Sequence, residues 1–153
     1  MNHFLDGDPF RYPGLSLQYR LLKNGPLGIA VMLVLSGGEG YFRSGDVMRH
    51  MTRLIQDGGT FDSQQYTEIG RWDRRNDDVI SPTPVADDAF YAWADPGFWD
   101  YDPPLVTYTK AEFMTLFEDC CRNFVAAHPE RREEFAAALA ANGMSLTPTI
   151  ERP

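Results

Sequence analysis

The residues best suited to chemistry are aspartates, and half of them lie in one segment of the chain. Residues 76–109 contain seven aspartates and no lysine or arginine, whereas the 153 residues together hold 14 Lys/Arg and 22 Asp/Glu. Carboxylates gathered in this way can bind a hard cation, act as a general acid and base, or pair with cations on another macromolecule. The seven are Asp77, Asp78, Asp87, Asp88, Asp95, Asp100 and Asp102.

Two Asp-x-Asp pairs, Asp6 with Asp8 and Asp100 with Asp102, are candidates for metal binding or acid–base hydrolysis. Neither pair belongs to the spaced ladder of ligands that defines an EF-hand loop, and Asp is favoured in short turns for backbone reasons alone. We therefore predict no metal site and no catalytic residue. A small hydrolase that uses a carboxylate pair is kept as an alternative function.

The other reactive side chains show no cofactor or catalytic motif. Residues 36–46 are rich in glycine but lack the lysine and the Ser/Thr of a phosphate-binding loop, and the three histidines lack metal-ligand spacing. Cys120 and Cys121 fall inside a predicted helix, beside phenylalanines and after two carboxylates. That setting favours core packing over a reactive thiolate. No cofactor is predicted.

Aromatic rings alternate with the aspartates between residues 89 and 104, where Pro, Gly and Asp disfavour a long helix or a central strand. Some rings, Trp93 or Trp99 among them, are expected in the core. Tyr and Trp are enriched among interface hot spots, and an acidic patch speeds association with a basic partner. The sequence therefore predicts a partner-binding site whose exposed anchors are Tyr91, Trp99 and Tyr101. Its charge contacts are Asp87, Asp88, Asp95, Asp100 and Asp102.

Composition argues against several classes of protein. A net charge of −8 and a pI near 4.7 lack the basic footprint of direct nucleic-acid binding. The longest apolar run, residues 27–35, is shorter than the roughly 20 residues of a membrane-spanning helix. Residues 1–10 have neither the basic start nor the apolar centre of a secretory signal. Because the two cysteines are adjacent and cannot form an ordinary disulfide, we expect a reduced, cytoplasmic protein.

Three helices are predicted from apolar periodicity and end signals. The first covers about residues 45–57 and ends at a pair of glycines. The second covers residues 110–127 and starts with Thr109 and Glu112 in the spacing of a capping box. The third covers residues 130–142, after a proline that suits the first turn of a helix.

The sheet is expected to start with an N-terminal hairpin. Residues 15–22 and 27–36 flank Asn24-Gly25, a strong turn signal, and the second segment is continuously apolar, as in an interior strand. Short strands are also predicted at residues 64–72 and 78–85, with a final one at residues 105–109.

These elements define a single α+β domain over residues 1–153. Its core is a small, mostly antiparallel sheet packed by the three helices. Loose ends are expected at about residues 1–13 and 144–153.

A compact, acidic α+β protein without a catalytic motif resembles the immunity proteins of bacterial polymorphic-toxin and contact-dependent growth inhibition systems. The resemblance is carried by residues 93–124, an acidic, aromatic loop that leads into an amphipathic helix. It implies a non-enzymatic inhibitor that binds the basic C-terminal domain of a secreted toxin, often a nuclease. The implied inhibitor is a monomer or weak dimer that contacts neither nucleic acid nor membrane.

Two other functions are kept open. A hydrolase predicts a concave pocket lined by aspartates. A homo-oligomeric adaptor predicts that the aromatic rings are buried against a second copy of the chain, which size-exclusion chromatography detects.

Overall fold

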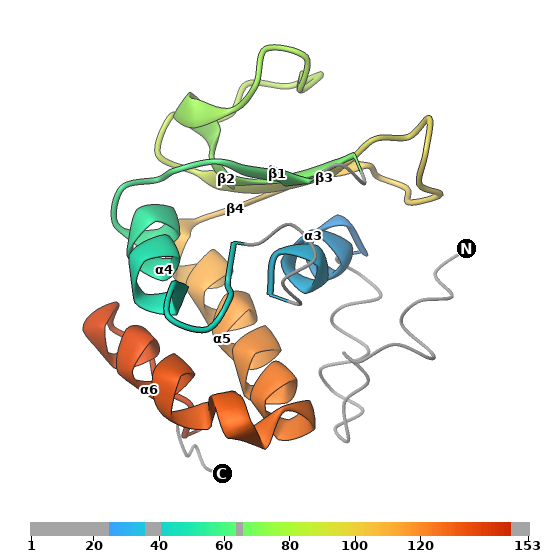
Figure 1. Ribbon diagram of the computed structural model, residues 1–153. Coiled ribbons are helices and arrows are strands. Elements are labelled where there is room, and N and C mark those ends of the chain that lie inside the picture. The colour runs from blue at the N-terminus through green and yellow to red at the C-terminus, as the bar shows by residue number, and fades with distance from the viewer. Residues whose placement is uncertain (1–24, 36–40, 64–65, 148–153) are drawn as a thin grey trace, which may run out of the picture.

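A computed structural model describes residues 25–35, 41–63 and 66–147 (Figure 1). A four-stranded antiparallel sheet forms one layer, and the helices cover one of its faces. The predicted α+β class is thus confirmed. Within these ranges, no helix has both the length and the apolarity needed to cross a membrane. The helices are α3 (Gly25–Leu35), α4 (Val47–Ile55), α5 (Lys110–Ala127) and α6 (Arg132–Ala141), with 3₁₀ turns η1 (Trp72–Arg74) and η2 (Pro129–Arg131).

The strands lie side by side in chain order, each antiparallel to the next: β1 (Phe61–Ser63), β2 (Thr67–Arg71), β3 (Phe90–Ala94) and β4 (Leu105–Tyr108). Alternate residues of a strand point to opposite faces of a sheet. The inner face packs on the helices and carries Ile69, Phe90 and Ala92. The outer face, on the side away from the helices, carries Tyr91, Trp93 and Leu105.

The long segment between β2 and β3, residues 72–89, arches over the outer face (Figure 1). It contributes Trp72, Val79 and Val85 to a second apolar cluster on that face. Residues 78–85 form no strand, in contrast to the prediction. Two prolines, Pro82 and Pro84, cannot donate to a β ladder, and the segment passes over the sheet without joining it.

β3 is a central strand, although the composition of residues 89–104 argues against one. The Pro and Gly of that stretch begin only after Asp95, so residues 90–94 are an unbroken run of aromatic residues and alanine. Such a run suits a strand that is covered on both faces. The predicted strands in residues 64–72 and 105–109 correspond to β2 and β4.

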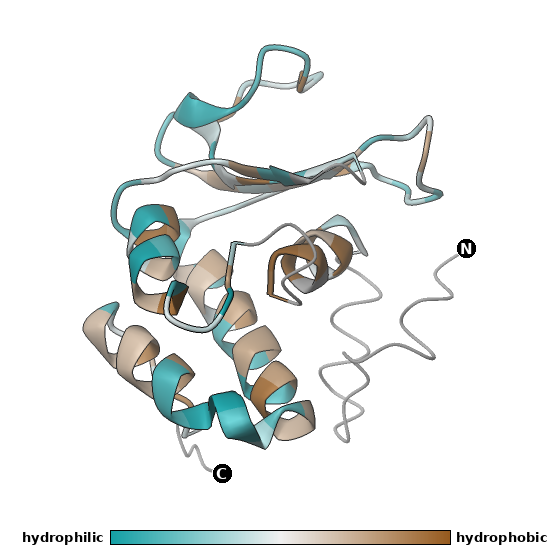
Figure 2. Cartoon of the chain, viewed as in Figure 1, coloured by the Kyte–Doolittle hydropathy of each residue, from teal (hydrophilic) through white to brown (hydrophobic). Residues whose placement is uncertain are grey.

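Residues 27–35 belong to helix α3 and not to the second strand of the predicted hairpin. A continuous apolar run is compatible with either element when all of its sides are buried. Pro26 lies in the first turn, where the missing N–H is tolerated. The helix is apolar around its circumference (Figure 2) and packs between the sheet and α5. Residues 15–22, the other half of that hairpin, lie outside the described residues.

The three predicted helices are confirmed as α4, α5 and α6. At the start of α5, Thr109 Oγ1 accepts a hydrogen bond from the Glu112 N–H at 3.1 Å. The Thr109 N–H donates in turn to Glu112 Oε1 at 2.8 Å, so the capping box forms. Gly143, with φ of 80°, follows α6 in the left-handed conformation that favours glycine.

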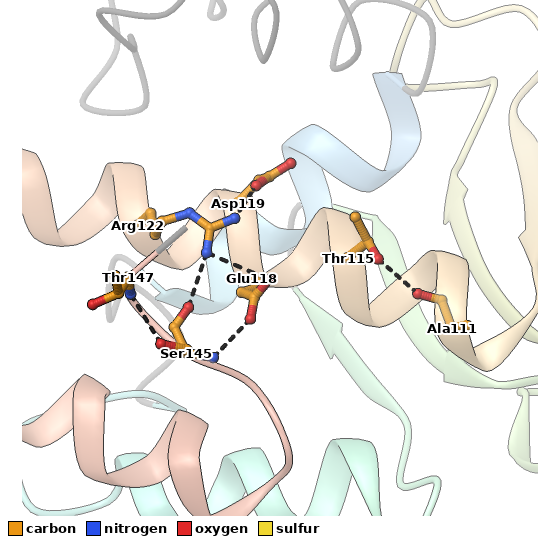
Figure 3. A network of polar contacts seen from close by, with 7 residues as sticks. All are labelled: Ala111, Thr115, Glu118, Asp119, Arg122, Ser145 and Thr147. Atoms are coloured by element: carbon orange, nitrogen blue, oxygen red, sulfur yellow. Dashed lines mark hydrogen bonds and ion pairs between the residues drawn. The ribbon is translucent and has the colours of Figure 1, made fainter. Parts of the chain in front are cut away.

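The residues after α6 are fixed to α5 by a polar network (Figure 3). The Ser145 N–H donates to Glu118 Oε2 at 2.7 Å, and Arg122 donates to the Ser145 carbonyl at 2.9 Å. Met144 and Leu146 are buried in the main core. Residues 144–147 are therefore packed against the core, in contrast to the loose end predicted for residues 144–153. Residues 1–13 and 148–153 lie outside the described part of the chain.

Candidate partner-binding surface

A buried carboxylate, Glu68, fixes the 72–89 loop to the outer face. It accepts hydrogen bonds from the Tyr91 hydroxyl, from the Asn76 N–H at 3.0 Å and from the Asn76 side-chain amide at 2.6 Å. Glu68 is only 2% exposed. A buried charge is tolerated when donors satisfy it in this way, and breaking such a set is costly. Glu68 thus positions the loop that carries the first of the acidic residues.

Tyr91 is structural and is not the exposed anchor that the sequence predicts. Its side chain is fully buried and meets the Trp72 ring edge-on, with 5.4 Å between the centroids. Burial, together with the hydrogen bond to Glu68, raises the pKa of the Tyr91 hydroxyl well above its usual range. The 72–89 loop covers the Tyr91 side chain. The residues next to Tyr91 in the sequence do not indicate that this loop passes over the sheet.

Tyr101 and Trp99 turn toward α3. Tyr101 is 7% exposed and packs with Ile29 and Ala94, and Trp99 is half-buried against the same cluster. The Tyr101 ring lies so close to Gly25 that a Cβ at that position would overlap it. The expectation that Tyr101 is an exposed anchor is therefore wrong, because the β3–β4 loop folds back onto the start of α3.

The exposed aromatic pair of this region is Phe98 with Tyr66, which we call the aromatic tip. Both side chains are 53% exposed, and their ring centroids lie 4.8 Å apart. The Asp95 N–H donates to the Tyr66 carbonyl at 2.9 Å, which joins the two turns at this end of the sheet. Tyr66 has φ of 63°, an uncommon conformation for a bulky residue. One signal for Phe98 was present in the sequence: it follows Pro96-Gly97, a turn that places it at a loop tip.

A groove of about 670 Å³ lies on the outer face, and we call it the acidic groove; its lining includes Asp95 and Pro96, which lead into the turn that carries Phe98. Trp93 and Leu105 line it from the strands, and Ile80, which is 74% exposed, from the 72–89 loop. Its charged lining residues within the described chain are Asp78 and Asp95. A second hollow of about 400 Å³ shares Pro84, Val85 and Thr107 with it and adds Asp88, Lys110 and Glu112.

The structure separates the predicted charge contacts into two groups. Asp87 and Asp88 precede β3, whereas Asp95, Asp100 and Asp102 follow it. The whole of β3, five residues or roughly 16 Å of strand at about 3.3 Å per residue, lies between the two groups. Asp78, which is absent from the predicted site, shares the acidic groove with Asp95. Of the five predicted charge contacts, Asp95 lines the acidic groove and the other four do not.

Among the described residues, most of these carboxylates have no cation of their own. The side chains of Asp77, Asp78, Asp87 and Asp102 form no hydrogen bond or ion pair with another described residue. Asp88 forms none either, but it lies near enough to Arg71 to help raise the pKa of that guanidinium. Asp95 accepts one hydrogen bond, from the Gly97 N–H at 2.9 Å.

Two of the preceding arginines are engaged inside the chain. Arg71 pairs with Asp73 at 2.7 Å. Arg75 lies over the Trp72 ring, 4.1 Å from its centroid, and donates to the Val79 carbonyl at 3.0 Å.

Neither metal chemistry nor thiol chemistry is favoured by the described residues. They contain no group of three or more His, Cys, Asp or Glu side chains that could hold a metal ion. Cys120 and Cys121 are buried in the main core, and burial raises the pKa of the Cys121 thiol well above its usual value. A high pKa keeps the thiol protonated and weakly nucleophilic.

Comparison with protein-family models, with curated proteins and with solved structures finds no match to this chain.

Proposed function

We propose that this protein is a non-enzymatic inhibitor that binds a basic protein partner through the outer face of its sheet. The observation that carries the proposal is the acidic groove on the outer face, whose lining residues Asp95 and Pro96 lead directly into the turn of the exposed Phe98. Exposed aromatic side chains supply buried area on binding, and uncompensated carboxylates select a cationic surface. The proposed partner is the C-terminal toxin domain of a secreted toxin, and the proposed site of action is the cytoplasm.

The energetics support a charged partner. Each carboxylate of this surface that lacks an internal cation can gain an ion pair on binding without losing one in the free protein. Like charges also repel acidic competitors, so the surface discriminates as well as attracts. The negative electrostatic potential of this surface is strong because residues 76–109 contain no lysine or arginine that would offset it.

Growth rescue tests the function directly. The proposed partner, a toxin domain that we expect to be encoded beside this gene, is expressed in bacteria with and without the protein, and co-expression should restore growth. Phe98→Ala combined with Asp95→Lys should abolish rescue, whereas Glu133→Lys on the exposed side of α6 should preserve it. A toxin that arrests growth equally with and without the unaltered protein would count against the proposal.

A carboxylate-pair hydrolase is the second candidate, because Asp78 and Asp95 line the same groove. It predicts turnover of a nitrophenyl glycoside or ester panel by the isolated protein. Asp78→Asn and Asp95→Asn should each abolish that turnover. The inhibitor proposal predicts no turnover of the panel by the unaltered protein.

A further inference from the structure

The acidic groove combines three features that suit a single cationic side chain. Trp93 offers an indole ring on the outer face of β3 and is half-buried. Asp78 and Asp95 contribute carboxylates from two different segments of the chain. Indole is the best aromatic partner for a cation, and a carboxylate nearby adds a charge-assisted hydrogen bond.

The groove is also stiff. Five of its lining residues are prolines, which have fixed φ angles and no backbone N–H: Pro82, Pro84, Pro96, Pro103 and Pro104. Rigid walls lower the entropy that is lost when a ligand binds. The five prolines contribute no N–H donor that could attract an anion, and the charged lining residues are the two carboxylates, which set the charge preference of the groove.

The same face already holds one arginine on one indole. Arg75 stacks on Trp72 and donates to the carbonyls of Trp72 and Val79 at 3.1 and 3.0 Å. Trp93 belongs to the same outer cluster as Trp72. Among the described residues, no Lys or Arg side chain lies over the Trp93 ring.

We propose that the acidic groove binds an arginine side chain of the partner, with its guanidinium stacked on Trp93 and paired with Asp78 and Asp95. The planar guanidinium suits both contacts at once, which the compact ammonium of lysine does not. This inference rests on the proposed function for the identity of the partner. Binding of an arginine probe by the isolated protein is a separate, measurable property.

The test is a titration of the ¹⁵N-labelled protein with the blocked peptide acetyl-Gly-Arg-Gly-amide. The three tryptophans each give an indole N–H signal, and Trp93→Phe identifies the one that belongs to the groove. Saturable movement of the Trp93 signal, with the Trp72 signal unmoved, is the expected result. The double variant Asp78→Asn with Asp95→Asn should lower the affinity for the peptide about fivefold. Glu133→Gln should leave that affinity unchanged.

Two matched peptides decide what the groove recognises. The citrulline peptide has the same shape without the charge and should not move the Trp93 signal. The lysine peptide should bind at least threefold more weakly than the arginine peptide. The inference is overturned if the Trp93 signal stays still with the arginine peptide, or if either matched peptide binds equally well. If the arginine peptide binds but the protein rescues no toxin-arrested cell, the inference stands and the proposed function fails.

Discussion

The Tyr91 hydroxyl donates a hydrogen bond to the carboxylate of Glu68, a residue of the neighbouring strand, beneath the loop that carries Asp78. The same carboxylate accepts two hydrogen bonds from Asn76 of that loop. The position of the acidic groove therefore depends on a buried polar cluster. The buried Glu68 thus holds in place the loop whose Asp78 lines the acidic groove.

Tyr91→Phe should lower the free energy of unfolding by about 1–3 kcal/mol, because a buried carboxylate loses one of its donors. Urea denaturation measures the change. Tyr66→Phe is the matched control: its side chain is exposed, so the same loss of a hydroxyl should leave the midpoint unaltered. Equal midpoints for Tyr91→Phe and the unaltered protein would show that the Glu68 cluster does not stabilise the fold.

Acid should destabilise the protein through His50. Burial lowers the pKa of this imidazole below 6.5, and the neighbouring Arg49 and Arg53 lower it further. The neutral form is therefore favoured in the folded protein. Its contribution to stability is fully present above pH 6.5 and is lost as the pH falls through the lower folded value. Urea midpoints measured across this range should fall toward acid and fall less steeply in His50→Leu. If the urea midpoint depends on pH equally in His50→Leu and in the unaltered protein, His50 does not cause the acid destabilisation.

Gly25→Ala should cost roughly 1–3 kcal/mol of stability, because the added methyl group overlaps the Tyr101 ring. A double-mutant cycle with Tyr101→Ala isolates this contact. Once the ring is absent, the methyl group has room, so the two losses should not add. Additive losses would mean that Tyr101 does not pack on the start of α3.

Local signals predicted the C-terminal helices well, since their information lies within a few residues. The spacing of Thr109 and Glu112 alone places the start of α5, and the capping box forms as expected. The strand predicted at residues 27–36 is wrong, and residues 27–35 belong to helix α3. An apolar run that is buried on all sides has no periodicity that distinguishes helix from strand.

The candidate site was harder to predict, since exposure there depends on distant segments. Tyr91 and Tyr101 are equally suited to an interface by residue type. The 72–89 loop covers Tyr91, and α3 covers Tyr101. The residues near each tyrosine in the sequence do not indicate these contacts. Phe98 escapes cover because it lies at the tip of a turn.

Phe98→Ala should lower the urea midpoint only slightly, because about half of the ring is exposed, yet weaken partner binding by about 2 kcal/mol, as expected of a hot spot. Isothermal titration calorimetry with the toxin domain measures the affinity. Met48→Ala is the matched control, because it removes exposed apolar area on α4, away from both the aromatic tip and the acidic groove, and no loss of affinity is expected from it. Unchanged affinity in Phe98→Ala would remove the aromatic tip from the interface.

The most direct measurement of the central claim is the affinity of the Asp78→Lys, Asp95→Lys double variant for the toxin domain. Glu133→Lys with Asp57→Lys is the control, since it makes the same charge change at exposed positions that do not line the acidic groove. The groove variant should lose several kcal/mol of binding, at roughly 2–5 per desolvated pair that is broken. The control should lose far less, and added salt should narrow the difference. Equal affinities for the groove variant, the control and the unaltered protein would contradict the claim that this surface binds a cationic partner.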